Sequence, residues 1–245
     1  ATGSDQAAHK SAAYAILVHK DNPLSKLSMQ QLDGIFGAQR TGGWNALVWN
    51  TQASRGSDQN LRTWGQLGLK GAWAKQPIHV YGPPLLGAGA ITEFQRQVLD
   101  GGAMWNEDLR EYADRKQMVA DLGNDKYGIA YTALSYRTDA VKPLAIAPSG
   151  STSAVALNRA NVSDRSYPLA RPVYLYFTID NARGELAEPR VTPLVEEFVR
   201  YVLSAQGQQA VANEGSYLPL TPALAEKQLN KLLSRELPPE RKKRT

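Results

Sequence analysis

Short apolar runs alternate with amphipathic stretches along much of the chain. The run Tyr14–Val18 is continuously apolar and ends at a charged turn, which is typical of a strand buried on both faces. Between residues 29 and 36 the apolar side chains recur at helical spacing, Ser28 is a suitable N-cap and Gly37 a suitable stop, so this stretch predicts a helix. The alternation of strands and helices predicts an α/β layered fold.

The same patterns predict the remaining elements. Residues 147–168 have the composition of a loop, and no internal repeat occurs. We expect strands at residues 77–81, 127–131, 141–146 and 172–179, and helices at residues 91–99, 115–122, 190–204, 206–214 and 221–234.

Residues 38–76 are rich in glycine, tryptophan and polar residues, and they predict an irregular excursion with one short helix. Clustered tryptophans can stack on a sugar or a base, but packing beneath long loops is the commoner role of such side chains. The tryptophans concerned are Trp44, Trp49, Trp64 and Trp73.

Composition excludes several classes of function. The chain has no cysteine, which removes disulfides and thiolate chemistry, and its 3 histidines lack metal-ligand spacing, so we expect no metal site. Part of the net charge of +5 lies in residues 240–245, a basic run after two prolines that is typical of a solvated tail. We therefore expect no nucleic-acid partner.

Neither end of the chain nor any internal run predicts stable membrane insertion. The apolar runs are far too short to span a bilayer. The first residues lack the basic and apolar regions of a secretory leader, so a leader has been removed or never existed.

A strand, a glycine-containing turn and a helix follow one another between Val80 and Leu99. A helix N-terminus offers unpaired backbone N–H groups and a partial positive charge, and glycine lets an anion approach them. The turn lacks the lysine of a nucleotide P-loop and the third glycine of the dinucleotide fingerprint. Backbone geometry alone is the other explanation for its glycines. The candidate ligand-binding residues are Gly87, Ala88, Gly89, Ala90, Ile91 and Thr92.

The sequence offers little support for catalysis. Ser57 and Asp58 lack the frame of a nucleophile elbow, and no histidine is near them in the sequence. The neighbouring carboxylates Glu196 and Glu197 are typical of a solvated helix face. We therefore expect a protein that is not an enzyme and needs no cofactor.

A series of phrases, in this order along the chain, resembles the substrate-binding proteins of phosphate ABC transporters. Each phrase is moderately specific, and together they cover residues 14–220. The most distinctive is Tyr167–Tyr176. The others are Leu17–Leu24, Leu32–Gly37, Thr63–Leu69, Pro77–Gly82, Tyr127–Tyr131, Leu203–Gln208 and Gly215–Leu220.

The resemblance implies an α/β fold of the two-lobed periplasmic-binding-protein type (type II). Residues 21–166 would form the second lobe, and residues 1–20 and 167–245 would form part of the first lobe with the strands that cross the hinge. It implies a monomeric periplasmic or secreted protein that holds inorganic phosphate or another small oxyanion between the lobes and delivers it to an ABC-transporter permease.

Two departures from the family pattern matter for function. Members carry some seventy or more residues before the phrase matched at Ala15–Pro23, and these build the core of the first lobe. In this chain that lobe is reduced or the segment comes from elsewhere. The family's phosphate turn has an arginine and Ser-Gly-Thr, where this chain has Pro83 and Ala88-Gly89-Ala90. Compensation would have to come from Thr92 or from an arginine such as Arg55 or Arg96. The alternative is a descendant that acts as a structural, adhesive or sensory module without phosphate.

Overall fold

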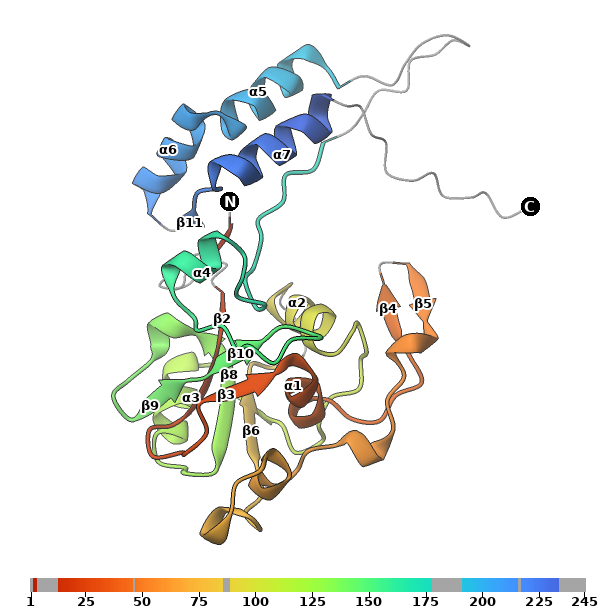
Figure 1. The fold of residues 1–245 in the computed structure, drawn as a ribbon, viewed down its shortest axis with the longest axis vertical. Helices are drawn as coiled ribbons and strands as arrows, with labels where there is room; N and C mark the ends of the chain where they lie inside the picture. The colour runs from red at the N-terminus through yellow and green to blue at the C-terminus, as the bar shows by residue number, and fades with distance from the viewer. Residues whose placement is uncertain are drawn as a thin grey trace, which may run out of the picture.

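The computed structural model shows a mixed α/β architecture around a central sheet, with a group of helices at one end (Figure 1). No helix in the described part of the chain is long and apolar enough to cross a bilayer. The described residues are 2–3, 13–45, 47–85, 89–177, 191–215 and 217–233.

The central sheet has five strands in the order β7-β6-β8-β2-β9. β6 runs parallel to both β7 and β8, whereas β2 runs antiparallel to both β8 and β9. Every residue of β2 is buried, which confirms the strand predicted from its continuous apolar run. The strands are β2 (Tyr14–His19), β6 (His79–Gly82), β7 (Arg110–Glu111), β8 (Gly128–Ala133) and β9 (Val141–Pro143).

Alternate side chains of β2 enter two separate hydrophobic clusters. Ile16 and Val18 belong to the cluster that contains residues of α1 (Met29–Phe36) and α2 (Gly89–Val98). Ala15 and Leu17 belong to the cluster that contains the buried residues of α3 (Arg115–Leu122). Because successive strand residues point to opposite faces, the sheet has a helix-covered core on each side.

Local chemistry explains why α1 begins and ends where the sequence predicts. The Ser28 hydroxyl accepts a hydrogen bond from the Gln31 backbone N–H, and the Gln31 side chain accepts one from the Ser28 N–H. This capping box satisfies two donors at the start of the helix. Gly37 follows the last helical residue, and its N–H bonds to the Asp33 carbonyl at 2.8 Å.

The predicted strand at 141–146 is divided between two sheets. β9 joins the central sheet, and β10 (Ala145–Ala147) pairs in parallel with β3 (Lys26–Ser28). Leu144 lies between them and its N–H bonds to the Ile16 carbonyl at 2.9 Å. The Ala145 N–H bonds instead to the Ser25 carbonyl at 3.0 Å, so the change of partner occurs between Leu144 and Ala145.

The excursion at 38–76 contains a hairpin and four short 3-10 helices rather than one short helix. Trp64 is fully buried, and its ring N–H donates to the Tyr127 carbonyl at 3.1 Å, as expected for packing beneath loops. Trp44 and Trp49 pack edge to face in the hairpin but stay 53% and 44% exposed. The elements are β4 (Gly43–Asn45), β5 (Val48–Asn50), η1 (Thr51–Ala53), η2 (Ser57–Gln59), η3 (Trp64–Leu67) and η4 (Gly71–Trp73).

The strand predicted at 172–179 is wrong for the part that the structure describes. Residues 173–177 form neither strand nor helix and their large apolar side chains are exposed, whereas residues 178–179 lie outside the described part of the chain. An apolar run forms a strand only where another strand pairs with it.

Residues 147–168 were predicted as a loop, and they contain the short helix α4 (Arg159–Ser163). The 3-10 helix η5 (Leu134–Tyr136) lies before them in the chain.

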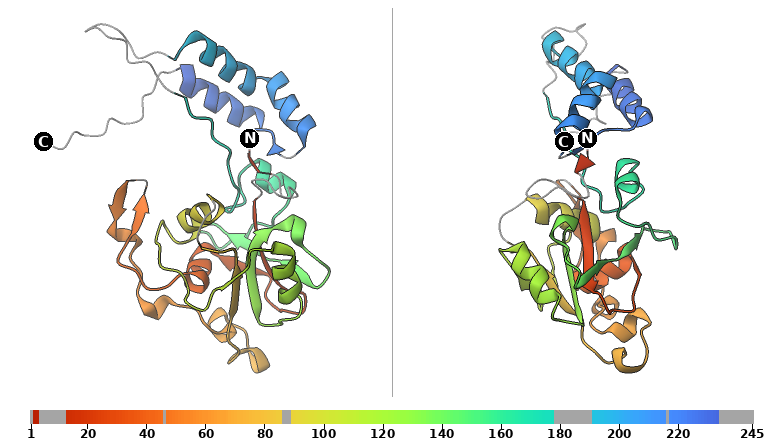
Figure 2. Two further views of the ribbon diagram at one scale, coloured as in Figure 1. Left: turned by 180° about the vertical axis from the view of Figure 1, so that it is seen from behind. Right: turned by 90° about the vertical axis from the view of Figure 1, so that its left-hand side faces the viewer.

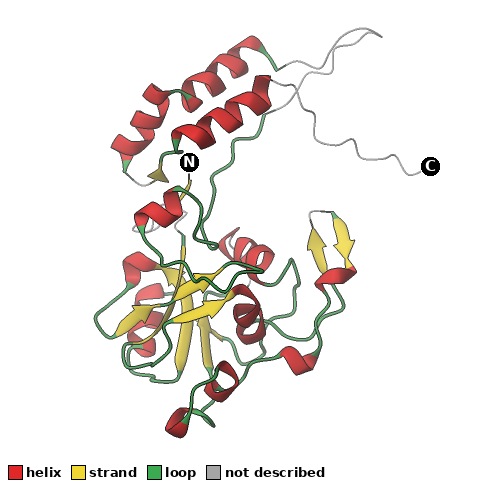
Figure 3. Ribbon diagram, in the orientation of Figure 1, coloured by secondary structure: helices red, strands yellow, loops and turns green. Residues whose placement is uncertain are grey.

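Three helices lie together beyond the sheet (Figures 2 and 3). They confirm the three helices predicted for this part of the chain. β11 (Tyr217–Leu218), which lies between the second and third of them, pairs antiparallel with β1 (Thr2–Gly3). The helices are α5 (Pro193–Leu203), α6 (Ala205–Glu214) and α7 (Pro222–Leu233).

Candidate functional site

The carboxyl ends of three parallel strands meet at one edge of the central sheet. Gly82 ends β6, Glu111 ends β7 and Ala133 ends β8, while the antiparallel strand β2 begins beside them because Tyr14 pairs with Ala133. In open α/β sheets, ligands bind outside the carboxyl ends of the strands. This edge is where the chain leaves β6 and enters α2, so it includes the helix start that the sequence singled out.

The structure describes four of the six predicted ligand-binding residues. Gly87 and Ala88 lie outside the described part of the chain. Gly89 and Ala90 form the backbone start of α2. Ile91 is only 6% exposed and belongs to the apolar core, and Thr92 is exposed. The assignment of these backbone groups to a ligand therefore stays a prediction.

Polar contacts fix the surroundings of α2. The Leu85 N–H donates to the Glu111 carboxylate at 2.9 Å, which ties the start of the connecting segment to the end of β7. On the other side, the Gln97 amide donates to the Ala170 carbonyl at 2.9 Å. The helix is thus held between residues that are far apart in the sequence.

Two tyrosine side chains, Tyr14 and Tyr131, lie near the carboxyl ends of these strands, on the face of the sheet that α2 covers. Tyr14 packs edge to face on Phe94, and the Arg171 guanidinium lies 5.0 Å from the centroid of the Tyr14 ring. Burial raises the pKa of Tyr14 to about 12, although the charge of Arg171 acts in the opposite direction. Tyr131 is 1% exposed, and burial likewise raises its pKa far above the ordinary phenol value. Both phenols are therefore protonated at neutral pH.

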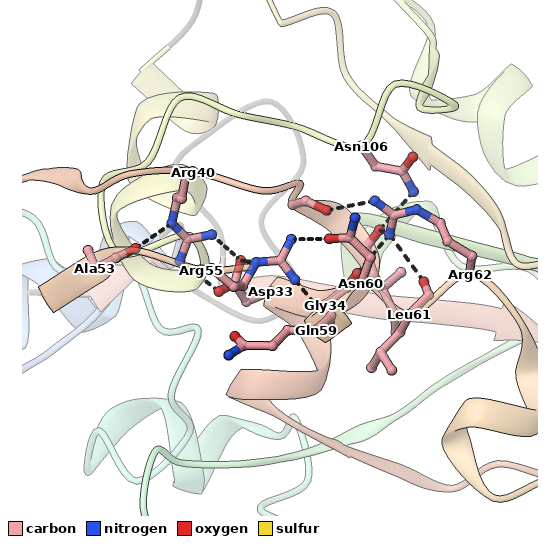
Figure 4. Close-up of polar contacts among 12 residues, drawn as sticks. Asp33, Gly34, Arg40, Ala53, Arg55, Gln59, Asn60, Leu61, Arg62 and Asn106 are labelled. Carbon is pink, nitrogen blue, oxygen red and sulfur yellow. Dashed lines mark hydrogen bonds and ion pairs between the residues drawn. The ribbon is translucent and has the colours of Figure 1, made fainter. Parts of the chain in front are cut away.

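Arg55, one of the two arginines considered as a replacement for the family's arginine, is engaged within a buried cluster (Figure 4). Its Nη atoms donate to the Gln59 carbonyl at 3.1 Å and to the Asn60 side chain at 2.7 Å, and its Nε lies 3.6 Å from Asp33 Oδ1. The same carboxylate accepts two hydrogen bonds of 2.7 Å from Arg40. Burial lowers the pKa of Arg55, with Asp33 acting against that effect.

Arg96 is engaged as well. Its Nε and Nη2 donate to the two carboxylate oxygens of Glu93 at 2.9 and 2.6 Å, one turn earlier on α2. Arg55 and Arg96 therefore both form hydrogen bonds with other groups of the protein. The cluster in Figure 4 connects the excursion at 38–76 to α1. Among the described residues, no group of three or more His, Asp or Glu side chains is arranged to hold a metal ion.

A family model described as the PBP superfamily domain matches residues 11–206. The chain belongs to the PBP superfamily. Among its relatives, the phosphate-binding protein PstS of Pseudomonas aeruginosa is 34% identical over 220 residues, which are 90% of this chain and 61% of that protein. Protein SphX of Synechococcus elongatus is 27% identical over 212 residues, 85% of this chain and 53% of that protein. The chain thus spans less than two thirds of the relatives it matches.

Solved structures support the fold of this PBP superfamily member. A possible phosphate binding protein from Planctomyces limnophilus matches with a TM-score of 0.57 and 17% identity, covering 91% of this chain and 69% of that one. An ABC-type phosphate transport receptor from Vibrio cholerae matches with a TM-score of 0.53 and 16% identity, covering 84% and 69%. These comparisons confirm the resemblance and the α/β binding-protein fold expected from the sequence.

Sequence reasoning missed one residue at the edge of the sheet. It singled out the phrase Tyr127–Tyr131 for its resemblance, but it gave the Tyr131 side chain no role. Alternation along β8 could have indicated that Tyr131 shares a face with Ile129. The aromatic residues around Tyr131 come from four further segments of the chain, and periodicity does not bring these together. They are Tyr14, Phe36, Phe94 and Trp105.

Proposed function

We propose that this PBP superfamily member is an extracytoplasmic solute-binding protein for phosphate or a related small oxyanion, which it delivers to the permease of an ABC importer. It would bind its ligand without transforming it. The observation that carries the proposal is the start of α2, a helix of 10 residues, at the carboxyl edge of parallel strands. Free backbone N–H groups and the helix dipole favour an anion at such a point.

The relatives support the same ligand class. The Pseudomonas aeruginosa protein is named for phosphate binding and matches 90% of this chain. Because the match covers 61% of that protein, the activity of the whole relative is carried to this chain only as a proposal. The periplasm or the exterior, a monomeric state and a permease partner belong to the same proposal.

We also propose the division into lobes that the resemblance implies. Residues 21–166 would form the second lobe, and residues 1–20 and 167–245 would contribute to the first. β2, at residues 14–19, lies inside the central sheet with β8 and β9, so it would pass through the hinge into the second lobe. Ligand closure would then be a hinge motion about the strands that connect the lobes.

Isothermal titration tests the proposal directly. The chain is titrated with phosphate, sulfate and simple carboxylates at low ionic strength, with glycerol as a neutral control. Saturable heat from at least one oxyanion and none from glycerol is expected. An absence of heat from every oxyanion would contradict the proposal.

Restoring the serine and threonine hydroxyls of the family's turn should raise the affinity of this chain for phosphate. Ala88→Ser combined with Ala90→Thr returns the Ser-Gly-Thr pattern of the family. Each regained hydrogen bond to a charged ligand contributes about 1.5–3 kcal/mol, so phosphate should bind at least about tenfold more tightly. The measurement is phosphate titration of the double variant beside wild type.

Ala120→Ser is the matched control for this pair of substitutions. It adds a hydroxyl at an exposed position inside α3, away from any helix start, and should leave the phosphate affinity unchanged. Equal affinities for the double variant and for wild type would show that the residues at 88 and 90 do not face the ligand.

A further inference from the structure

The hydroxyl of Tyr131 is a buried polar group without a hydrogen-bond partner in the described part of the protein. The residue is 1% exposed and the oxygen atom has almost no contact with solvent. Buried hydroxyls in native proteins are almost always paired, and leaving one unpaired destabilises the fold. An unpaired hydroxyl at this position therefore calls for a partner that the described residues do not supply.

The position of the ring shows which way this hydroxyl lies. The ring stacks on Phe94 of α2 with centroids 3.9 Å apart and an interplanar angle of 18°. Its outer half lies against Gly82, where an added Cβ would come within 2.7 Å of Tyr131 Cε1 and 3.4 Å of Cζ. Cζ carries the hydroxyl, so this end of the ring is beside the last residue of β6, where the chain departs toward α2.

Surrounding aromatic rings hold the phenol in this position. Phe36 and Tyr14 contact the Tyr131 ring edge to face, with centroids 5.4 and 6.1 Å away, and Trp105 stacks nearby at 6.2 Å. A donor fixed in this way loses little conformational entropy when a ligand arrives. Because burial keeps the phenol protonated, it offers an O–H donor to an anionic acceptor.

We infer that the Tyr131 hydroxyl donates a hydrogen bond to the oxyanion that binds at the start of α2. From β8 it would supply a side-chain donor to a site whose turn lacks the family's serine, threonine and arginine. Gly82 has a matching role, since any side chain there would displace the ring. This inference rests on the proposed function and names one more residue of the same site.

Tyr131→Phe tests the inference with a minimal change of shape. Phosphate titration should give an affinity about ten to a hundred times weaker than that of wild type, as expected for the loss of one hydrogen bond to a charged group. The melting temperature of the ligand-free variant should equal or exceed that of wild type, because an unpaired buried hydroxyl has been removed. A purely structural role would not combine weaker binding with undiminished stability.

Thr132→Val is the matched control variant. Thr132 is the next residue of β8, is 5% exposed, and also has a buried hydroxyl with no hydrogen-bond partner among the residues that the structure describes. Its side chain points to the opposite face of the sheet, so its loss should leave the phosphate affinity unchanged. Both variants are checked by circular dichroism and thermal melting before titration.

The outcomes separate the inference from the function on which it rests. If wild type binds phosphate and Tyr131→Phe binds it equally well, the inference is overturned and the proposed function stands. If wild type binds no oxyanion, both are overturned. If Tyr131→Phe melts well below wild type, the hydroxyl has a structural partner, which also overturns the inference.

Discussion

At the scale of single residues, the amino ends of the parallel strands carry different polar groups from the carboxyl ends. Opposite the candidate site, Asp125 accepts hydrogen bonds from the Tyr81 hydroxyl at 2.8 Å and from His79 Nδ1 at 2.7 Å. The Tyr127 N–H donates to the same carboxylate at 3.0 Å. These polar groups are paired with one another, and this pairing is typical of a role in stability.

The Asp125 carboxylate predicts a dependence of stability on pH. Burial alone would raise its pKa, but the hydrogen bonds from Tyr81, His79 and Tyr127 outweigh burial and lower it. A carboxyl whose pKa is lower in the folded state stabilises the fold above its unfolded pKa, about 3.9. That contribution is lost as the pH falls through the folded pKa.

We therefore expect the free energy of unfolding of wild type to exceed that of Asp125→Asn at pH 6, and the difference to shrink below about pH 4. Urea denaturation at a series of pH values measures it. Asp139→Asn, at an exposed position, provides the baseline and should give a small difference at all pH values. A difference between wild type and Asp125→Asn that persists undiminished at pH 3 would contradict this account.

At the scale of elements, buried arginine side chains connect the excursion at 38–76 to α1. Arg40 places both Nη atoms on Asp33 of α1 and its Nε on the Ala53 carbonyl at 2.8 Å. Arg62 reaches the carbonyls of Gly34 and Gly37 near the end of the same helix. Guanidinium groups in this irregular segment thus provide hydrogen bonds in place of those that a helix or sheet would form.

Arg40→Met should destabilise the protein by about 3–5 kcal/mol, because Asp33 would remain buried without its bidentate partner. Arg96→Met is the matched control, since its pair with Glu93 lies on the surface with the arginine side chain 57% exposed, and should cost less than about 1 kcal/mol. Chemical denaturation of both variants measures the difference. Equal losses would mean that burial of the Asp33 pair has no energetic consequence.

Elements specified by nearby residues were predictable from the sequence. Helix α1 follows from its own capping box, and β2 from its own apolar run. The exposed run at 173–177 and the division of residues 141–147 between two sheets depend on partners far away in the sequence. The start of α2 was predictable as a candidate site because its glycines and helical pattern are adjacent in the sequence. The position of the Tyr131 hydroxyl was not, because it depends on packing between distant segments.

At the scale of the whole molecule, an extended segment leads from the sheet toward the C-terminal helices (Figure 1). Tyr174 and Tyr176 in this segment are 62% and 87% exposed, and on α5 the side chains of Leu194 and Phe198 are 82% and 53% exposed. Each of these two segments therefore presents large apolar side chains to solvent.

Chymotrypsin should cut this segment first, between residues 174 and 177, because its aromatic side chains are exposed and its backbone is not part of a helix or strand. Limited digestion followed by intact-mass spectrometry locates the first cut. The competing site is the hairpin with Trp44 and Trp49, which are also exposed. First cleavage there would show that the extended segment is covered in solution.

The position of β2 in the chain affects how the protein folds. Tyr14 of this strand pairs with Ala133, and its carbonyl accepts a hydrogen bond of 2.7 Å from the Tyr167 hydroxyl. During synthesis β2 therefore emerges long before its partners and stays without them until β8 and the residues around Tyr167 have left the ribosome. Such distant pairing is typical of slow folding and leaves an apolar strand exposed to aggregation until its partners arrive.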